Sequence, residues 1–569
     1  GVVDLLVSTH QPRLLADRDF ELVAEFFFQL KILADHARRG GRVVVVGSGF
    51  AGIYALWQAR QRGLSVRGFE RGSDVGGTWY WNAYPGARCD VESYNYAYFF
   101  NNDIVRDWNW SNACAGQAEI QRYLRFVAER CDVIKDITFN TKVVSARYDD
   151  ATGWWSVGTA AGDTIVCRYV VLAIGALSDP KAPDIAGVAD FAGESWFTSS
   201  WPKDGSVDLR GKRVGVIGTG ATGIQVIQTI AAQVGELKVF QRTPQYAVPM
   251  RNEAYDDAAR NAWRVQYPRL RESVQHTFVG LDFDLMTESY LDLSPQERLA
   301  ALEKLWADGS LSFWVGGFAE LLDNEVVNAE ISEFTRAKIR ARIKDPVLAE
   351  KLVPKSFGFG TARVPLESGY YDVYNRDNVE LVDVSETPIA GFTENGLLVG
   401  EQEYPLDVVI LATGFDAGTG ALSRMDIHGR DGRSLTELWS KDIRSTLGLQ
   451  VHGFPNLFTV AGPLAPSTAF CNMATCLQQQ VDWVTDCIAY LREQGRNSIE
   501  PSSEKEAWWV QHHDETANGT LMMTTNSWYT GANIEGKPRR LLSYIGGVGK
   551  YREFCDEAKT NHYEGYIVA

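Results

Sequence analysis

Long uncharged apolar runs are missing from this chain of 569 residues. A helix that crosses a bilayer needs about 20 consecutive apolar residues, so a transmembrane segment is excluded. The stretch from Gly1 to Phe20 also lacks a basic region followed by an apolar core, and a secretory signal is therefore not predicted. These absences favour a cytoplasmic protein without membrane attachment.

Cysteine is scarce, with 8 residues and no CxxC pair. We expect buried thiols in a reducing compartment, not a disulfide framework or a zinc module. Cys471 and Cys476 have no partner pair, HExxH is absent, and the adjacent His512 and His513 point in different directions. No metal site is predicted.

Positive charge is in deficit, because 56 Lys and Arg residues face 72 Asp and Glu residues, for a formal net charge of −16. Such a surface repels a phosphate backbone, so nucleic acid is excluded as a partner. Apolar residues, in contrast, make up 45% of the chain. At this length they predict more than one domain with a large buried core.

A glycine-rich turn follows the first predicted strand, Arg42 to Val46. It reads Gly47-Ser48-Gly49-Phe50-Ala51-Gly52 and leads into a helix at Ile53 to Gln61. The first glycine allows the tight bend, the second lets backbone N–H groups approach a pyrophosphate, and the third lets the helix pack on the strand. Glu70 ends the next strand, 18 residues after Gly52, where a carboxylate binds an adenosine ribose. This unit predicts an FAD site.

The pattern recurs after the strand predicted at Arg213 to Ile217. Gly218-Thr219-Gly220-Ala221-Thr222-Gly223 opens a helix that ends near Ala232, and the strand Leu237 to Gln241 is followed by Arg242 and Thr243. A guanidinium pairs with the 2′-phosphate that a carboxylate would repel. This second unit therefore predicts NADPH over NADH. The alternative is that Arg242 is a solvated arginine at a strand end.

Two more strands with a following glycine, Tyr169 to Gly175 and Val408 to Gly414, are typical of connections between nucleotide domains. We predict an α/β fold with two Rossmann-like dinucleotide-binding domains and a helical insertion. The FAD-binding domain is predicted at 41–175 and 405–569, and the NADPH-binding domain at 176–404 with the insertion at about 251–355. An N-terminal helical extension is predicted at 1–40, because the stretch Phe20 to Leu33 has the spacing of an amphipathic helix.

The segment from Gly76 to Ser93, GGTWYWNAYPGARCDVES, resembles the flavin-site signature of type I Baeyer–Villiger monooxygenases. The resemblance continues through Phe191 to Pro202, Gln241 to Pro244 and Ser527 to Asn533, and covers nearly everything after residue 41. It implies a monomeric enzyme that uses FAD, NADPH and O2 to insert oxygen beside a ketone carbonyl, giving an ester or a lactone.

The resemblance also implies the site residues. Besides the turn glycines Gly47, Gly49 and Gly52, the FAD contacts would be Glu70, Thr78, Trp79, Tyr80, Trp81, Asp90, Tyr96 and Met473. The NADPH contacts would be Thr219, Gly220, Ala221, Thr222, Gly223, Gln225, Arg242, Thr243 and Trp528, with Arg88 and Asp90 where the nicotinamide meets the flavin. The loop from Ala465 to Phe470 would line the substrate pocket, and the apolar Phe470 favours an apolar cyclic or polycyclic ketone.

Arg363 matches the arginine that lies beside the flavin ring in this family. Reduced flavin adds O2 to give a C4a-peroxide, which attacks a ketone as the anion and creates an oxyanion, and a fixed guanidinium stabilises both charges. Asp90 is expected to orient Arg363 by a charge-assisted hydrogen bond. The alternative is a structural arginine that pairs with Glu367, four residues later.

Two positions depart from the family pattern. Phe197 stands at the histidine position of the interdomain motif, where we expect packing to be kept and a hydrogen bond to be lost. Ala362 stands where a lysine usually helps to hold the 2′-phosphate, so we expect weaker discrimination against NADH.

Two alternative functions stay open. One is a flavin monooxygenase that oxygenates nitrogen or sulfur, against which Trp201-Pro202 and Arg363 argue. The other is a catalytically degenerate FAD- and NADP-binding protein, against which Asp90 and Arg363 argue.

Overall fold

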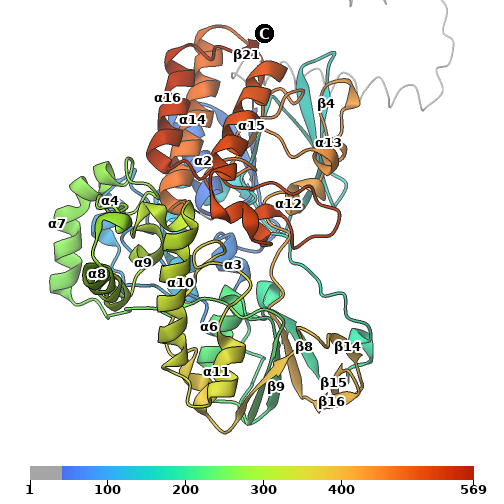
Figure 1. The fold of residues 1–569 in the computed structure, drawn as a ribbon. Coiled ribbons are helices and arrows are strands. Elements are labelled where there is room, and N and C mark those ends of the chain that lie inside the picture. The colour runs from blue at the N-terminus through green and yellow to red at the C-terminus, as the bar shows by residue number, and fades with distance from the viewer. Residues whose placement is uncertain (1–41, 469) are drawn as a thin grey trace, which may run out of the picture.

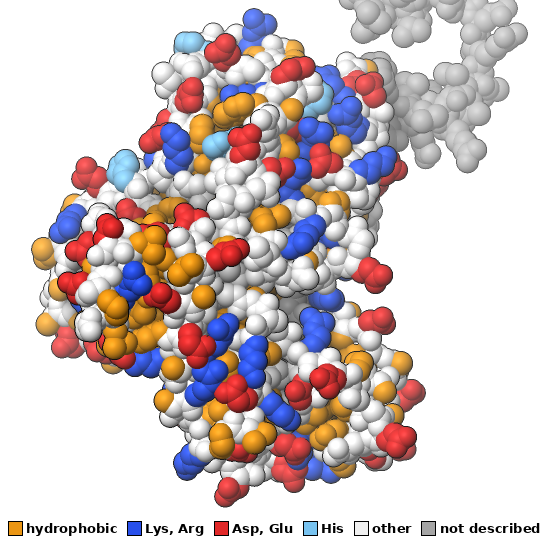
Figure 2. Space-filling model, viewed as in Figure 1, with side chains coloured by type: hydrophobic (Ala, Val, Ile, Leu, Met, Phe, Trp, Pro, Cys, Tyr) orange, Lys and Arg blue, Asp and Glu red, His pale blue; other side chains and the backbone are white. Residues whose placement is uncertain are grey.

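The computed structural model describes residues 42–468 and 470–569, so the extension predicted at 1–40 lies outside the described residues. Figure 1 shows helix α14 (Met473–Glu493) in the upper part of the molecule, strand β9 (Arg213–Ile217) in the lower part and helix α8 (Pro295–Asp308) on the left. On the face shown in Figure 2, basic and acidic side chains are interspersed over both parts.

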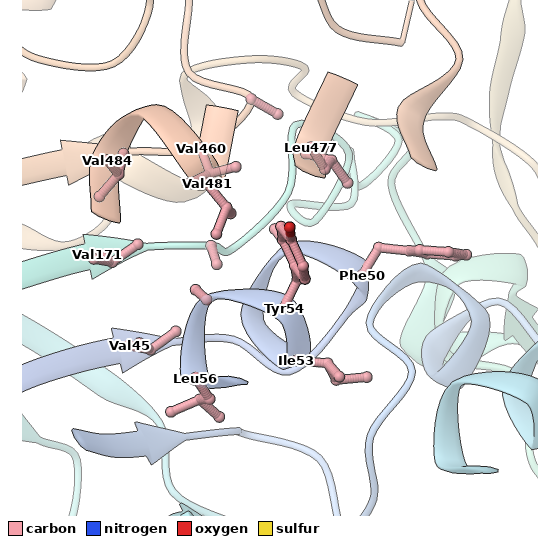
Figure 3. Packing of buried hydrophobic residues seen from close by; sticks show 14 of the residues in the cluster. Val45, Phe50, Ile53, Tyr54, Leu56, Val171, Val460, Leu477, Val481 and Val484 are labelled. Carbon is pink, nitrogen blue, oxygen red and sulfur yellow. The ribbon is translucent and has the colours of Figure 1, made fainter. Parts of the chain in front are cut away.

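The first sheet is parallel and has the strand order β19-β7-β1-β2-β3. Alternate valines of β1 face two different cores: Val43 and Val45 pack with helix α2 and helix α14, as Figure 3 shows for Val45, and Val44 and Val46 pack against a four-stranded sheet. A strand covered on both faces is continuously apolar, which explains its sequence RVVVV. The elements are β1 (Arg42–Val46), α2 (Phe50–Gln61), β2 (Ser65–Phe69), β3 (Ile137–Thr138), β7 (Tyr169–Leu172) and β19 (Leu457–Thr459).

The second sheet repeats this arrangement with the order β8-β17-β9-β10-β13, again all parallel. Its strands are β8 (Glu194–Phe197), β9 (Arg213–Ile217), β10 (Glu236–Gln241), β13 (Val379–Asp383) and β17 (Val408–Leu411), and α6 (Ala221–Ile230) follows the second glycine-rich turn. The predicted fold class, two Rossmann-like units in one chain, is confirmed.

The predicted boundary at residue 405 is wrong by one strand. Strand β17 was assigned to the second part of the FAD-binding domain, but it pairs with β9 and β8. It occupies in the second sheet the place that β7 occupies in the first. The chain returns to the first sheet only after β17. The first glycine of each glycine-rich turn packs against the residue that follows the neighbouring strand, so each sheet needs such a strand of its own.

The region between β11 (Val248–Pro249) and β12 (Leu366–Glu367) is helical, as predicted. Its helices are α7 (Asp257–Ser273), α8 (Pro295–Asp308), α9 (Ser312–Val315), α10 (Glu325–Arg340) and α11 (Pro346–Leu352). Ser294 caps α8 in a reciprocal capping box with Glu297, and Asn324 caps α10. These caps explain where α8 and α10 begin.

The remaining elements complete the two halves. The four-stranded sheet contains β4 (Val143–Asp149), β5 (Trp154–Thr159), β6 (Thr164–Cys167) and β18 (Asp426–His428), and a three-stranded sheet contains β14 (Ile389–Phe392), β15 (Gly396–Val399) and β16 (Gln402–Pro405). The other main helices are α3 (Thr78–Trp81), α4 (Asn102–Asp107), α5 (Gln117–Arg130), α12 (Gly420–Ser423), α13 (Leu435–Lys441), α15 (Ser503–Asn518) and α16 (Val548–Thr560), and β20 (Ile499–Pro501) pairs with β21 (Tyr566–Val568). Within the described ranges, no helix combines the length and the apolarity needed to cross a bilayer.

Within the second glycine-rich turn, Gly220 and Gly223 are predicted to tolerate an added methyl group differently. A Cβ at Gly223 would lie 2.1 Å from the carbonyl oxygen of Gly218, whereas a Cβ at Gly220 would meet nothing within 4 Å. We expect Gly223→Ala to destabilise the protein by about 1–3 kcal/mol through overpacking. The matched control Gly220→Ala should unfold within about 1 °C of the wild type, since such surface changes cost little. Equal melting temperatures for the two variants would contradict this.

Candidate active site

The first glycine-rich turn is packed tightly against its neighbours. Gly47 has φ +100°, and a Cβ there would lie 2.4 Å from the carbonyl oxygen of Ala173. A Cβ at Gly52 would lie 1.9 Å from the carbonyl oxygen of Gly47. Helix α2 begins at Phe50 without a side-chain cap. Its first turn therefore offers backbone N–H groups to an anion.

A cavity opens beside this turn and encloses about 1450 Å³ of space, part of it open to solvent. It brings together segments that are far apart in the chain, from the turn, from α3 and from the start of α14. Eight of the predicted FAD contacts line it, namely Gly47, Gly49, Glu70, Thr78, Trp79, Trp81, Tyr96 and Met473. Gly52, Tyr80 and Asp90 are not among its lining residues.

The carboxylate of Glu70 is buried and held from both sides. It accepts hydrogen bonds from the backbone N–H of Ser48 at 2.9 Å, from the Ser48 hydroxyl at 3.0 Å and from the backbone N–H of Gly72 at 2.8 Å. An ionised carboxylate can accept about four hydrogen bonds. Glu70 therefore retains one acceptor position for a ribose hydroxyl and is fixed in place to use it.

The second turn has the same internal packing. Gly218 has φ +108°, and a Cβ there would lie 2.5 Å from the carbonyl oxygen of Ala412, which follows β17. The Thr219 hydroxyl donates to the carbonyl oxygen of Thr243 at 2.9 Å. Arg242 is exposed at the end of β10 and forms no ion pair within the described part of the chain. A free guanidinium is thus available where a 2′-phosphate is expected.

Gln225 joins α6 to the flavin-signature segment. Its side-chain oxygen accepts from the Tyr84 hydroxyl at 2.8 Å, and its amide nitrogen donates to the carbonyl oxygen of Arg88 at 3.0 Å. A Cβ at Gly86 would lie 2.5 Å from the carbonyl oxygen of Gln225. The two halves of the molecule therefore touch here, and the NADPH contact predicted for Gln225 stays a prediction.

Arg363 and Asp90 form the predicted ion pair. One guanidinium nitrogen of Arg363 donates to Asp90 Oδ2 at 2.9 Å, and the backbone N–H of Leu366 donates to the same oxygen at 3.3 Å. Burial raises the pKa of Asp90, and the positive charge of Arg363 opposes that shift. Glu367, the alternative partner of Arg363, pairs instead with Arg342. The alternative of a structural Arg363–Glu367 pair is therefore wrong.

The helical insertion holds the loop that carries Arg363. The indole N–H of Trp314, in α9, donates to the carbonyl oxygen of Gly360 at 3.1 Å, and the guanidinium carbon of Arg363 lies 5.5 Å from the Trp314 ring centre. The side-chain amide of Asn328, in α10, donates to the carbonyl oxygen of Phe359 at 2.9 Å. A cation over an aromatic face is stabilised. Sequence reasoning missed Trp314 because its contact with Arg363 spans 49 residues.

A row of buried aromatic rings begins at Trp314, beside Arg363. The ring of Phe470 lies 5.6 Å from the ring of Trp314 and 6.4 Å from the ring of Tyr529. All three side chains are at most 2% exposed. Ala465, the other predicted pocket residue, belongs to the core of the first half, where its backbone pairs with Tyr544. Trp528 is half-buried beside Tyr529.

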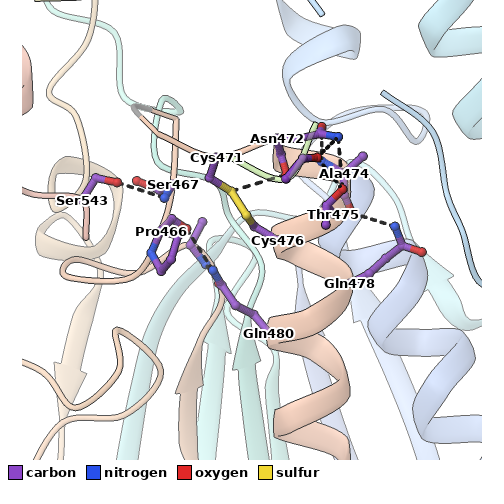
Figure 4. Close-up of a disulfide and its surroundings, with 12 residues drawn as sticks. Pro466, Ser467, Cys471, Asn472, Ala474, Thr475, Cys476, Gln478, Gln480 and Ser543 are labelled. Carbon is purple, nitrogen blue, oxygen red and sulfur yellow. Dashed lines mark hydrogen bonds between the residues drawn. A yellow bond between two sulfur atoms is a disulfide. The ribbon is translucent and has the colours of Figure 1, made fainter. Parts of the chain in front are cut away.

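Cys471 and Cys476 form a disulfide at the start of α14 (Figure 4), so the expectation of free buried thiols is wrong for these two cysteines. The other six cysteines are free and buried, as predicted. Asn472 caps α14, which places Cys471 just before the cap and Cys476 at the fourth helical residue. Side chains at these two positions face each other at a helix start. That local spacing is the signal that would have predicted the bond.

Comparisons with known proteins agree with this geometry. Residues 41–266 match the family model for pyridine nucleotide-disulphide oxidoreductases. The chain is 51% identical over 526 residues to acetone monooxygenase (methyl acetate-forming) of Gordonia sp. (strain TY-5), covering 92% of this chain and 98% of that protein. It is 40% identical over 528 residues to a Baeyer–Villiger monooxygenase of Pseudooceanicola batsensis, covering 92% and 95%. The crystal structure of OTEMO in complex with FAD and NADP matches with a TM-score of 0.90 at 41% identity, covering 93% of this chain and 99% of that one.

The repeated sheets, the two glycine-rich turns and the arginine–carboxylate ion pair define an oxidoreductase of the class with two dinucleotide-binding domains. Full-length identity to the relatives narrows this class to one family. The chain belongs to the Baeyer–Villiger monooxygenases.

Glu92 lies within the signature segment, and the structure gives its carboxyl group an unusual environment. Burial raises the pKa of Glu92 to about 7, and the nearby Asp282 adds to the shift while Arg251 opposes it. A carboxyl group whose folded-state pKa is raised favours the folded protein at low pH, and that contribution is lost as the pH rises through about 7.

We therefore expect the wild type to lose stability relative to Glu92→Gln as the pH is raised from about 5 to about 8, by no more than about 3 kcal/mol. Thermal unfolding of both proteins at the two pH values measures the effect. A difference between them that does not change with pH would contradict the environment described for Glu92.

Proposed function

We propose that this protein is an FAD-dependent monooxygenase that uses NADPH and O2 to convert a ketone into an ester or a lactone. The single observation that carries the proposal is the ion pair between the half-buried Arg363 and the buried Asp90. Asp90 of this pair lies close in the chain to Arg88, whose carbonyl oxygen accepts a hydrogen bond from Gln225 where the two nucleotide-binding halves touch. A degenerate binding protein would have no need to bury such a pair, because its desolvation is costly.

The first half is proposed to hold FAD. The turn glycines leave room for a pyrophosphate, Glu70 has an acceptor position left for a ribose, and Met473 and Trp79 line the same cavity. The second half is proposed to hold NADPH, with Gly220 open to a ligand and Arg242 free to meet a 2′-phosphate. When bound, FAD supplies hydride acceptance and the activation of O2, which no side chain can provide.

The chain's own contribution is electrostatic. Oxygen insertion beside a carbonyl develops negative charge on oxygen, and a fixed guanidinium stabilises such charge without having to reorient. Asp90 and the Trp314 ring hold Arg363 in place. The buried rings of Trp314, Phe470 and Tyr529 give the site an apolar wall.

The aromatic wall supports an apolar ketone as the substrate. Trp314 lies against Arg363, Phe470 contacts Trp314, and Tyr529 contacts Phe470. None of these three aromatic side chains carries a charge with which a charged substrate could pair. The acyclic substrate in the name of the Gordonia relative widens the class from cyclic and polycyclic ketones to small acyclic ones. A suitable panel contains acetone, small cyclic ketones, and steroidal and terpenoid ketones, scored by product.

We expect the purified protein to form an ester or lactone from at least one ketone of this panel, and Arg363→Ala to lower that rate by about a hundredfold or more. FAD binding and NADPH-driven flavin reduction should persist, because Arg363 is not among the lining residues of the FAD cavity. Gas chromatography and flavin absorbance measure the two properties.

A matched control is Arg298→Ala, which removes an ion pair with Glu330 on the helical insertion and should retain activity. Ester formation by Arg363→Ala at the wild-type rate would refute the proposed role. Sulfoxide from a thioether, with no ester from any ketone, would indicate a sulfur-oxygenating enzyme instead.

Arg242→Ala should raise the KM for NADPH by about tenfold or more and leave the KM for NADH unchanged, since only NADPH carries the 2′-phosphate. The wild-type KM ratio of NADH to NADPH should stay below about a hundred, because Ala362 offers no second cation. Arg210→Ala, which removes an exposed arginine paired with Asp208, is the matched control. An equal rise in both KM values would contradict the assignment.

A further inference from the structure

Two buried polar atoms beside Arg363 have no hydrogen-bond partner within residues 42–468 and 470–569. They are Asp90 Oδ1 and the hydroxyl oxygen of Tyr529. Most buried polar groups in proteins form a hydrogen bond, so each exception asks for an explanation. Both unpaired atoms lie beside the Arg363 guanidinium, which indicates that they form hydrogen bonds with a bound ligand.

The position of Tyr529 is tightly constrained. It lies in the short 3-10 helix η9 (Trp528–Thr530), where its backbone N–H donates to the Ser527 hydroxyl at 3.2 Å. Its carbonyl oxygen accepts from the backbone N–H of Leu542 at 2.8 Å. The side chain is 2% exposed and its ring contacts Phe470. The hydroxyl is therefore held in one place beside Arg363, and its proton has no acceptor there.

The charge of Arg363 acts on this hydroxyl. Burial raises the pKa of Tyr529 to about 12, while the charge of Arg363 and a hydrogen-bonding contact of its guanidinium with the hydroxyl oxygen lower it, and the Asp90 charge raises it. All three groups thus lie within electrostatic reach of one another. At neutral pH the phenol stays protonated, so it is a hydrogen-bond donor next to a positive charge.

We propose that Tyr529 is a further catalytic residue, whose hydroxyl donates a hydrogen bond to the ketone oxygen on which Arg363 stabilises negative charge. Two donors from different elements, one charged and one neutral, then converge on the same oxygen. A buried donor whose proton has no internal acceptor needs no rearrangement to do this. The inference rests on the proposed function. Tyr529 contributes a hydrogen bond only and transfers no proton.

The test is Tyr529→Phe in the FAD-loaded full-length enzyme. We expect ester formation per NADPH consumed to fall about tenfold or more, with H2O2 accounting for the missing product. Flavin reduction by NADPH and the KM for NADPH should be unchanged. The melting temperature should change little, because the hydroxyl proton has no hydrogen-bond acceptor within the described part of the protein.

A matched control is Tyr374→Phe, which removes a buried hydroxyl that donates to Tyr370 at 2.9 Å. This variant should lower the melting temperature and leave product formation per NADPH unchanged. The two variants thus separate a catalytic hydroxyl from a structural one.

Three outcomes would overturn the inference. Unchanged product yield in Tyr529→Phe would show that the hydroxyl does not act on the ketone. A higher KM for NADPH with unchanged yield would assign the hydroxyl to the nicotinamide. A lower melting temperature with proportional loss of all activities would make it structural. If the wild type forms no ester from any ketone, the proposed function fails instead, which the same product assay reveals.

Discussion

The ion pair between Arg363 and Asp90 joins segments that are 273 residues apart in the chain. A buried pair repays its desolvation only when its geometry is held closely. The protein meets this requirement from several directions, with the Leu366 N–H on the carboxylate and the Trp314 ring against the guanidinium. The rest of the architecture can be understood as the means of bringing these groups together and keeping water away from them.

The two sheets show how one arrangement is used twice for different ligands. In each sheet a central strand leads into a glycine-rich turn, and the carbonyl oxygen of a residue that follows the neighbouring strand, Ala173 or Ala412, lies against the first glycine. The local differences lie at the end of the next strand, where Glu70 is buried and hydrogen-bonded and Arg242 is exposed and unpaired within the described residues. The backbone therefore forms two similar glycine-rich turns, and one side chain near each turn, Glu70 or Arg242, distinguishes the two sites.

The helical insertion has a structural role at the proposed active site. Trp314 and Asn328 hold carbonyl oxygens of the loop just before Arg363, and this contact can form only if α9 and α10 pack against that loop. On the other side, the Cys471–Cys476 disulfide ties the loop of Phe470 to the first turn of α14, which carries Met473. The walls of the FAD cavity and of the Arg363 site are thus parts of one continuous structure.

Local spacing was enough to determine the strands β1 and β9, both glycine-rich turns and the helical character of the insertion. It also determined the charged residue at the end of the strand that follows each turn and its helix, which is Glu70 in the first half and Arg242 in the second. All these features depend on residues close together in the chain. Tertiary structure alone decided that Glu367 pairs with Arg342, that Trp314 faces Arg363, that Gln225 bridges the two halves and that β17 belongs to the second sheet. Each of these contacts joins elements whose relative placement follows from the packing of whole sheets and helices. No pattern of neighbouring residues encodes that packing.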